Sequence, residues 1–250
     1  MSLVDRRIRV AFAIGDYPPV ERKRREDAAL AYSSPEVEVG IISVKATPHY
    51  YGNAPDLLGL AVPAFVDAFR EAEKQGYDAV VPLGTLDLGV DAGRSVVDIP
   101  VVGPSESMLH IASMLGRRFG VLHYHDFNLP LSYRMVERFN MIHKVVGWRN
   151  CGFELPDIAA NRDAVVATFI EKAKELISLG ADVILPMGIT QCPVHIKPDW
   201  LMNELGVPVV GHRRADPARR HAGETEAALQ QKILPQIVAV RRQMTRSKTD

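Results

Sequence analysis

Short apolar runs alternate with longer stretches of helical periodicity along the chain. The runs are rich in Val and Ile at consecutive positions, which is typical of strands buried on both faces. They predict strands at residues 8–14, 37–44, 79–82, 101–103, 119–122, 183–185 and 209–211. The amphipathic segments between and after them predict helices at residues 56–75, 105–115, 161–179 and 224–244. Strands that alternate with helices in this way indicate an α/β fold with mostly parallel sheets.

Two stretches of the sequence occur twice in the same order. The run GYDAVVPLG at Gly76–Gly84 resembles GADVILPMG at Gly180–Gly188, and PVVG at 100–103 is repeated at 208–211. The chance similarity of two buried strands is one explanation, but two matches at nearly the same spacing favour an internal duplication.

The duplication predicts two similar α/β lobes, each with a parallel sheet. We expect the first lobe at residues 1–116 with a returning helix from 217–250, and the second at 117–216. Duplicated sheets of this type place a ligand at the carboxyl ends of their strands. The active site is therefore expected in a cleft between the lobes.

Composition excludes several classes of function. The 250 residues are 47% hydrophobic and 24% charged, and 30 basic residues balance 30 acidic ones. A net charge of zero argues against a nucleic-acid or membrane-surface partner, and the short basic run at residues 21–25 is expected to be a solvated helix face. Two cysteines and no visible signal peptide or membrane span suggest a cytoplasmic protein, and its size suggests a homo-oligomer.

Polar and titratable residues are concentrated in the loops that follow the predicted strands, where sites are built in such folds. The catalytic candidates are His123, His125, Cys192 and His195. The substrate-binding candidates are Asp16, His49, Tyr50, Gly84, Thr85, Ile189, Thr190 and His212. Thr85 and Thr190 follow the two repeated strands, so their hydroxyls and nearby backbone N–H groups could form a paired cradle for a carboxylate.

The His and Cys candidates leave three possibilities open. His123, His125, Cys192 and His195 could hold a catalytic zinc, since a thiolate and imidazoles suit that metal. They could instead transfer protons directly, or the histidines could satisfy local backbone groups. Cys192 would have a lowered pKa if a helix begins at Pro193, and would be an ordinary buried thiol if the helix begins at Pro198.

At these residues the chain resembles the aspartate/glutamate/hydantoin racemase superfamily, and most of all its hydantoin racemase branch. The resemblance extends over roughly residues 7–215 and is most specific from Arg94 to Phe119 (RSVVDIPVVG…SMLHIASMLGRRF). It also includes YDAVV at 77–81 with Asp87, and the second repeat at Gly180–Gly188. The resemblance implies two α/β lobes with the site between them, no required cofactor, and proton transfer next to a carbonyl.

The resemblance also implies two facing cysteines, one to remove the proton and one to return it on the opposite face. In this chain Gly84 and Ile189 occupy those two positions, and neither has an acid or base. Glycine followed by Thr85 resembles the arylmalonate decarboxylase branch, which keeps the second cysteine. Racemisation by two cysteines is therefore doubtful, and Cys192 or the histidines are expected to have taken over.

Three functions remain open. The first is a superfamily enzyme with a non-standard catalytic set, which acts on a small carboxylate or a hydantoin-like ring by isomerisation or decarboxylation. The second is a zinc-assisted hydrolase of a hydantoin-like ring. The third is a non-catalytic protein that binds small molecules, although so many titratable loop residues argue against it.

Overall fold

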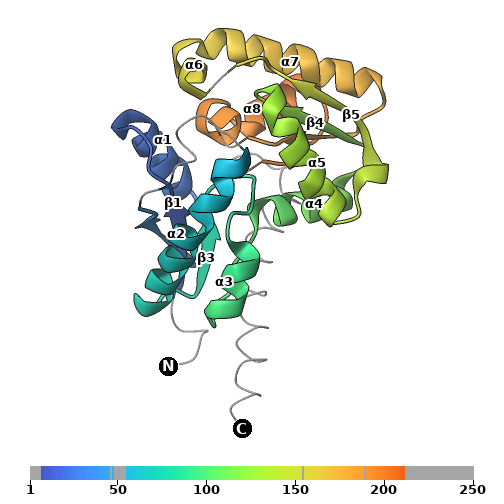
Figure 1. Ribbon diagram of the computed structural model, residues 1–250. Coiled ribbons are helices and arrows are strands. Elements are labelled where there is room, and N and C mark those ends of the chain that lie inside the picture. Colours follow the sequence, from blue (N-terminus) through green and yellow to red (C-terminus); the bar gives the residue numbers. More distant parts are fainter. Residues whose placement is uncertain (1–6, 46, 48–54, 154, 189, 212–250) are drawn as a thin grey trace. The chain divides into compact units, whose positions relative to one another are not determined.

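The computed structural model describes residues 7–45, 47, 55–153, 155–188 and 190–211 (Figure 1). The chain divides into two compact units. Within the described residues, the first contains 7–83 and 87–103, and the second contains 84–86 and 104–211. The expected division at residue 116 differs from this one, because the helix that begins at Pro104 packs within the second unit. The expected helix at 217–250 lies outside the described residues.

The first unit is built on a parallel three-stranded sheet in the order β2-β1-β3. Its strands are β1 (Ile8–Ile14), β2 (Val37–Ser43) and β3 (Ala79–Pro82), and its helices are α1 (Pro19–Leu30), α2 (Pro55–Lys74) and α3 (Val90–Val96). The core contains apolar residues from all three strands, from α2 and from the segment around Val101. The alternating strands and helices predicted from the apolar pattern are thus confirmed here.

The second unit repeats this plan with the order β5-β4-β6, again parallel. Its strands are β4 (Phe119–His123), β5 (Val145–Asn150) and β6 (Val183–Pro186). Its helices are α4 (Pro104–Leu115), α5 (Leu129–Arg138), α6 (Leu155–Ala160), α7 (Arg162–Ser178) and α8 (Pro198–Leu205). Short helical turns are η3 (Asp126–Asn128), η4 (Ile142–Lys144) and the π-type η5 (Thr190–His195).

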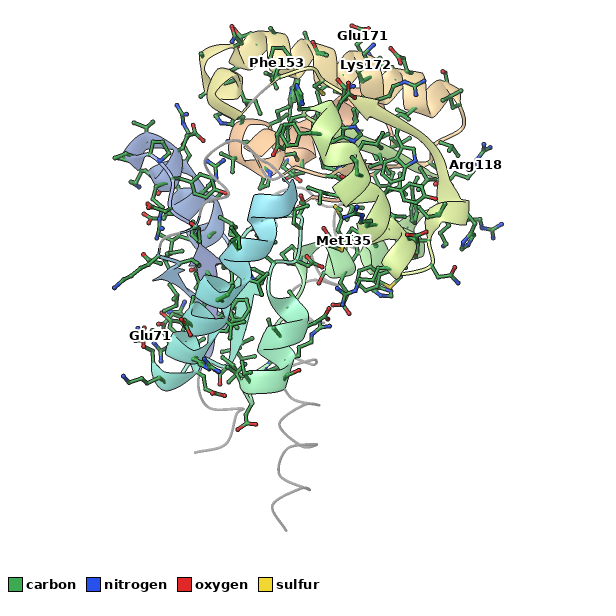
Figure 2. All side chains as sticks on the ribbon, viewed as in Figure 1. Glu71, Arg118, Met135, Phe153, Glu171 and Lys172 are labelled. Atoms are coloured by element: carbon green, nitrogen blue, oxygen red, sulfur yellow. The ribbon has the colours of Figure 1, made fainter. Side chains whose placement is uncertain are left out.

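Two clusters of apolar side chains cover the two faces of the second sheet. The α4/α5-side cluster contains Phe119 and Val121 of β4, together with residues of both helices. The α7/α8-side cluster contains Leu122 of β4, together with residues of α7 and α8. Figure 2 labels one residue from each side, Met135 of α5 in the first cluster and Phe153, which packs against the second. This alternation along β4 is what a strand buried on both faces requires.

Two predicted strands are reduced to bridges in the structure, and one strand was not predicted. The segments around Val101 and Val209 form only single parallel bridges, to Val80 and Ile184. Strand β5 was not predicted, since every one of its residues is only half-buried and its sequence VVGWRN lacks a continuous apolar run. Among the described residues, no helix is long and apolar enough to cross a membrane.

Candidate functional site

The strand pairings define equivalent positions in the two units. Val10 pairs with Ala79 in the first sheet as Phe119 pairs with Val183 in the second. Counting along the central strands from these pairs, Ile14 at the end of β1 is equivalent to His123 at the end of β4. The hydrogen bonds support this equivalence. The carbonyl of Ile14 accepts a hydrogen bond of 2.8 Å from the N–H of Val44, just after β2, and the carbonyl of His123 accepts one of 2.9 Å from the N–H of Cys151, just after β5.

His123 is almost completely buried at the carboxyl end of the central strand β4, with 1% of its surface exposed. Side chains alternate along a strand, so His123 lies on the same face as Phe119 and Val121, which is the face that α4 and α5 cover. Asn150 is paired with His123 in the register of β5 and donates a hydrogen bond to the carboxylate of Asp126. The polar side chains of His123 and Asn150 therefore lie at the carboxyl end of the sheet on the α4/α5 side.

Burial keeps the His123 ring neutral. Loss of solvation lowers the pKa of His123 from 6.5 to about 4, a shift that the nearby Asp126 carboxylate opposes and His125 reinforces. At pH 7 the ring therefore carries no charge and presents one N–H donor and one nitrogen acceptor. The buried Nδ1 has no hydrogen-bond partner among the described residues. A buried polar atom without a partner in a strand end is unusual and requires an explanation.

His125 bonds to a local backbone group, which is one of the three possibilities left open by the sequence. Its Nδ1 accepts a long hydrogen bond of 3.5 Å from the backbone N–H of Phe127, at the start of η3. Its ring lies 4.8 Å from the Phe127 ring, measured between centroids. The chain has left the strand by this point, so the two histidines are not held side by side by a common strand.

Cys192 is buried on the other side of the second sheet. It belongs to the α7/α8-side cluster with Leu122 and Tyr124, and 2% of its surface is exposed. A methyl group added to Gly211 would lie 3.2 Å from its sulfur. Its backbone is extended within η5, and α8 begins only at Pro198, so the thiol is not at the N-terminus of that helix.

His195, the last candidate of this segment, ends η5 and is also largely buried. Its carbonyl accepts a hydrogen bond of 3.3 Å from Nε of Arg162, the first residue of α7. No three His, Cys, Asp or Glu side chains within the described ranges approach closely enough to hold one metal ion. His123 and Cys192 are in particular separated by the sheet. The zinc site predicted at His123, His125, Cys192 and His195 stays a prediction.

Gly84 and Thr85 belong to the second unit, although they follow β3 of the first. Gly84 has a φ of +147°, and a Cβ built on it would meet no atom within 4 Å. The carbonyl of the buried Thr85 accepts a hydrogen bond of 2.5 Å from the hydroxyl of Ser105. Ser105 is in the first turn of α4, so this loop is attached to the helix that covers the His123 face.

In the first unit, the loop after β1 is held by arginines that the sequence analysis placed on a solvated face. Arg22 donates to the carbonyls of Ile14 and Gly15 at 3.1 and 3.0 Å. Arg25 is 1% exposed, pairs with Glu21 and stacks over the Tyr17 ring at 4.0 Å. The solvated-face prediction was wrong for Arg25, because the helix turns this side chain toward the loop.

Among the substrate-binding candidates of the first unit, Asp16 is exposed, and its backbone N–H donates to the hydroxyl of the buried Thr47 at 2.7 Å. His49, Tyr50, Ile189 and His212 lie outside the described residues, and so does the side chain of Thr190. Asn150, Ser105 and Thr47 are not among the residues predicted from the sequence. Each is a polar residue near the end of an element: Asn150 ends β5, Thr47 lies in the loop after β2, and Ser105 lies in the first turn of α4.

These features define a duplicated α/β protein with polar residues at the carboxyl ends of its strands. The chain belongs to the Asp/Glu/Hydantoin racemase family, whose model matches residues 28–214. A hydantoin racemase of Pseudomonas sp. (strain NS671) is 26% identical over 185 residues, which are 74% of this chain and 73% of the relative. The membership predicted from the runs at 94–119 and 180–188 is thus confirmed.

Solved structures show the same fold. The allantoin racemase from Klebsiella pneumoniae has a TM-score of 0.74 at 18% identity, over 90% of this chain and 88% of its own. Arylmalonate decarboxylase has a TM-score of 0.55 at 19% identity, over 86% of this chain and 96% of its own. The predicted α/β architecture with two similar parallel-sheet units is therefore confirmed.

Proposed function

We propose that this chain is an enzyme that acts on a small hydantoin-like ring or carboxylate, at the carbon next to a carbonyl, and from one face of the substrate. The observation that carries the proposal is Gly84. By the family resemblance it occupies the position of the first cysteine, and its φ of +147° is a conformation that L side chains rarely adopt. The loop is thus shaped for glycine, and no thiol can act there.

A one-sided mechanism suits isomerisation or decarboxylation better than racemisation, because racemisation needs an acid on the face opposite the base. We place the site on the α4/α5 side of the second sheet. His123 lies there, and Thr85 is bonded there to the first turn of α4. Cys192 packs on the opposite face with Leu122 and Tyr124, which supports a role in the core.

The test is solvent deuterium exchange by the purified full-length protein. Both enantiomers of several 5-substituted hydantoins, and a set of 2-substituted malonates, are incubated in heavy water. Proton NMR follows loss of the hydrogen next to the carbonyl, and chiral chromatography follows inversion. We expect exchange with retained configuration, or loss of carbon dioxide, in at least one substrate class. Inversion as fast as exchange would contradict the one-sided mechanism.

Two further arms separate the alternatives. Binding by calorimetry without exchange or turnover across the panel would favour a non-catalytic binding protein. Repeating the reaction after treatment with a chelator, together with elemental analysis, tests the zinc-assisted alternative. About one zinc per chain whose removal abolishes turnover would replace the proposal. A Cys192→Ala variant that folds normally but exchanges nothing would move the reacting group to the α7/α8 side.

A further inference from the structure

We propose that His123 is a catalytic residue that donates a hydrogen bond from its neutral ring to the enolate oxygen formed during the reaction. This inference rests on the proposed function and adds a named group to it. His123 neither gains nor loses a proton in this role, which distinguishes it from a general base and from a metal ligand.

His123 destabilises the fold at a position where an aliphatic side chain would not. Its Nδ1 is buried and has no partner among the described residues, a situation that destabilises the fold. The equivalent strand end in the first unit is occupied by Ile14, which is fully buried and has no such cost. The scaffold therefore accepts an aliphatic side chain here, and the imidazole is explained better by a ligand than by packing.

The second argument is the location of the ring. Helix α4 ends at Leu115 and β4 begins at Phe119, so the helix runs antiparallel to the sheet on which its cluster packs. Its first turn therefore lies toward the carboxyl end of the strands, on the same face as His123. A helix of 12 residues carries a partial positive charge at that end. This charge favours an oxygen that becomes negatively charged.

The third argument is the charge state. With a pKa lowered to about 4, His123 stays neutral throughout the physiological range. A ring that resists protonation is a poor base for a carbon acid, but its N–H remains a donor. When the bond from carbon to carboxylate breaks, carbon dioxide leaves and the electron pair of the bond moves into the adjacent carbonyl. When the bond from carbon to hydrogen breaks, a water molecule takes the proton and the electron pair moves in the same way. The charge that appears on this oxygen strengthens the hydrogen bond from His123 until carbon is protonated again.

The experiment compares three substitutions in the reaction that the wild-type protein catalyses. His123→Ile installs the residue of the equivalent position in the first unit and removes every donor. His123→Asn places an amide N–H near Nδ1, and His123→Gln places one near Nε2. The exposed His143, replaced by Gln, is the matched control. Thermal unfolding of each variant verifies the fold.

We expect His123→Ile to lower kcat by about 10²–10³-fold with little change in KM, as loss of one oxyanion donor does elsewhere. Either the Asn or the Gln variant should recover at least about tenfold of that loss. Equal inactivity of all three variants would overturn the inference in favour of a proton-transferring His123. Unchanged kcat in His123→Ile would reduce the residue to packing. Absence of any wild-type turnover would overturn the proposed function and this inference with it.

Discussion

The two units share a scaffold down to individual hydrogen bonds. Leu83 donates to Ala13 at 2.8 Å after β3, and Met187 donates to Leu122 at 2.7 Å after β6. Near the start of the central strands, the backbone N–H of Arg9 donates to the Asp78 carboxylate, as that of Arg118 does to Asp182. Both arginine side chains also donate to a carbonyl just after the helix that leads into the neighbouring strand, α2 for Arg9 and α7 for Arg118, and Figure 2 labels Arg118.

The units differ where the strands end. Ile14 in the first unit is equivalent to the buried, neutral His123 in the second. After β3 the chain passes through Gly84 in a glycine conformation, whereas after β6 it enters η5. The duplicated halves have therefore kept the hydrogen bonds that build the sheet, and they differ in the residues at the strand ends, where we propose that the ligand binds. This division between scaffold and site can be tested at matched positions.

The largest expected effect concerns acid stability. Because folding lowers the pKa of His123 from 6.5 to about 4, the unfolded chain binds a proton more readily than the folded one. The contribution of His123 to the free energy of unfolding is then fully present above about pH 6.5. It falls by about 3 kcal/mol as the pH drops toward 4, at about 1.4 kcal/mol per pKa unit. His123→Ile should lack this component.

Chemical denaturation at pH 7.5 and pH 4.5 measures the difference. Other groups titrate equally in both proteins, so only the gap between the two stability curves reports on His123. Parallel curves at all pH values would contradict the assigned neutral state, and with it the contrast between the two strand ends.

The two equivalent aspartates provide a second comparison. Asp78 is fully buried and Asp182 is half-exposed, while both accept backbone N–H groups at the start of a central strand. Asp78→Ala should cost about 2–3 kcal/mol and Asp182→Ala about 1 kcal/mol, because water can replace the lost acceptor only at the second site. Urea titrations give both values, and a larger loss for Asp182 would break the parallel.

A third, smaller effect separates Gly84 from a glycine that has no special conformation. Gly84→Ala should destabilise the fold by about 1–2 kcal/mol, since alanine must adopt a φ of +147°. Gly59 is exposed in α2 and also has no atom within 4 Å of an added Cβ. Gly59→Ala should therefore stabilise by about 0.5–1 kcal/mol through helix propensity. Effects of the same sign would show that the backbone of Gly84 is not constrained.

The sequence predicted the fold better than the site, for a physical reason. Buried parallel strands such as β1 and β6 are continuous apolar runs, and the repeat at 76–84 and 180–188 marked the duplication. Strand β5 was not predicted because a strand at the edge of a sheet needs no continuous apolar run, and its Trp148 and Arg149 are only half-buried. Apolar periodicity therefore finds the central strands and misses the exposed edge.

The sequence named the candidate residues, but it did not predict on which face of the sheet each of them lies. The alternation of Val121, Leu122 and His123 already assigns His123 to one face of its strand. The face that Cys192 occupies depends on how η5 packs, which no local pattern encodes. The burial of Arg25 depends on the Tyr17 ring, which lies in the loop before α1 and stacks with the guanidinium.

The most direct test of the account is the charge state of His123 measured by nitrogen-15 NMR from pH 8 to pH 4. The resonances of this ring are assigned by their absence in His123→Ile. We predict that the ring stays neutral until the pH approaches 4, while the exposed His143 serves as an internal comparison. Titration of His123 near pH 6.5 would contradict the assignment of a neutral donor at the end of β4.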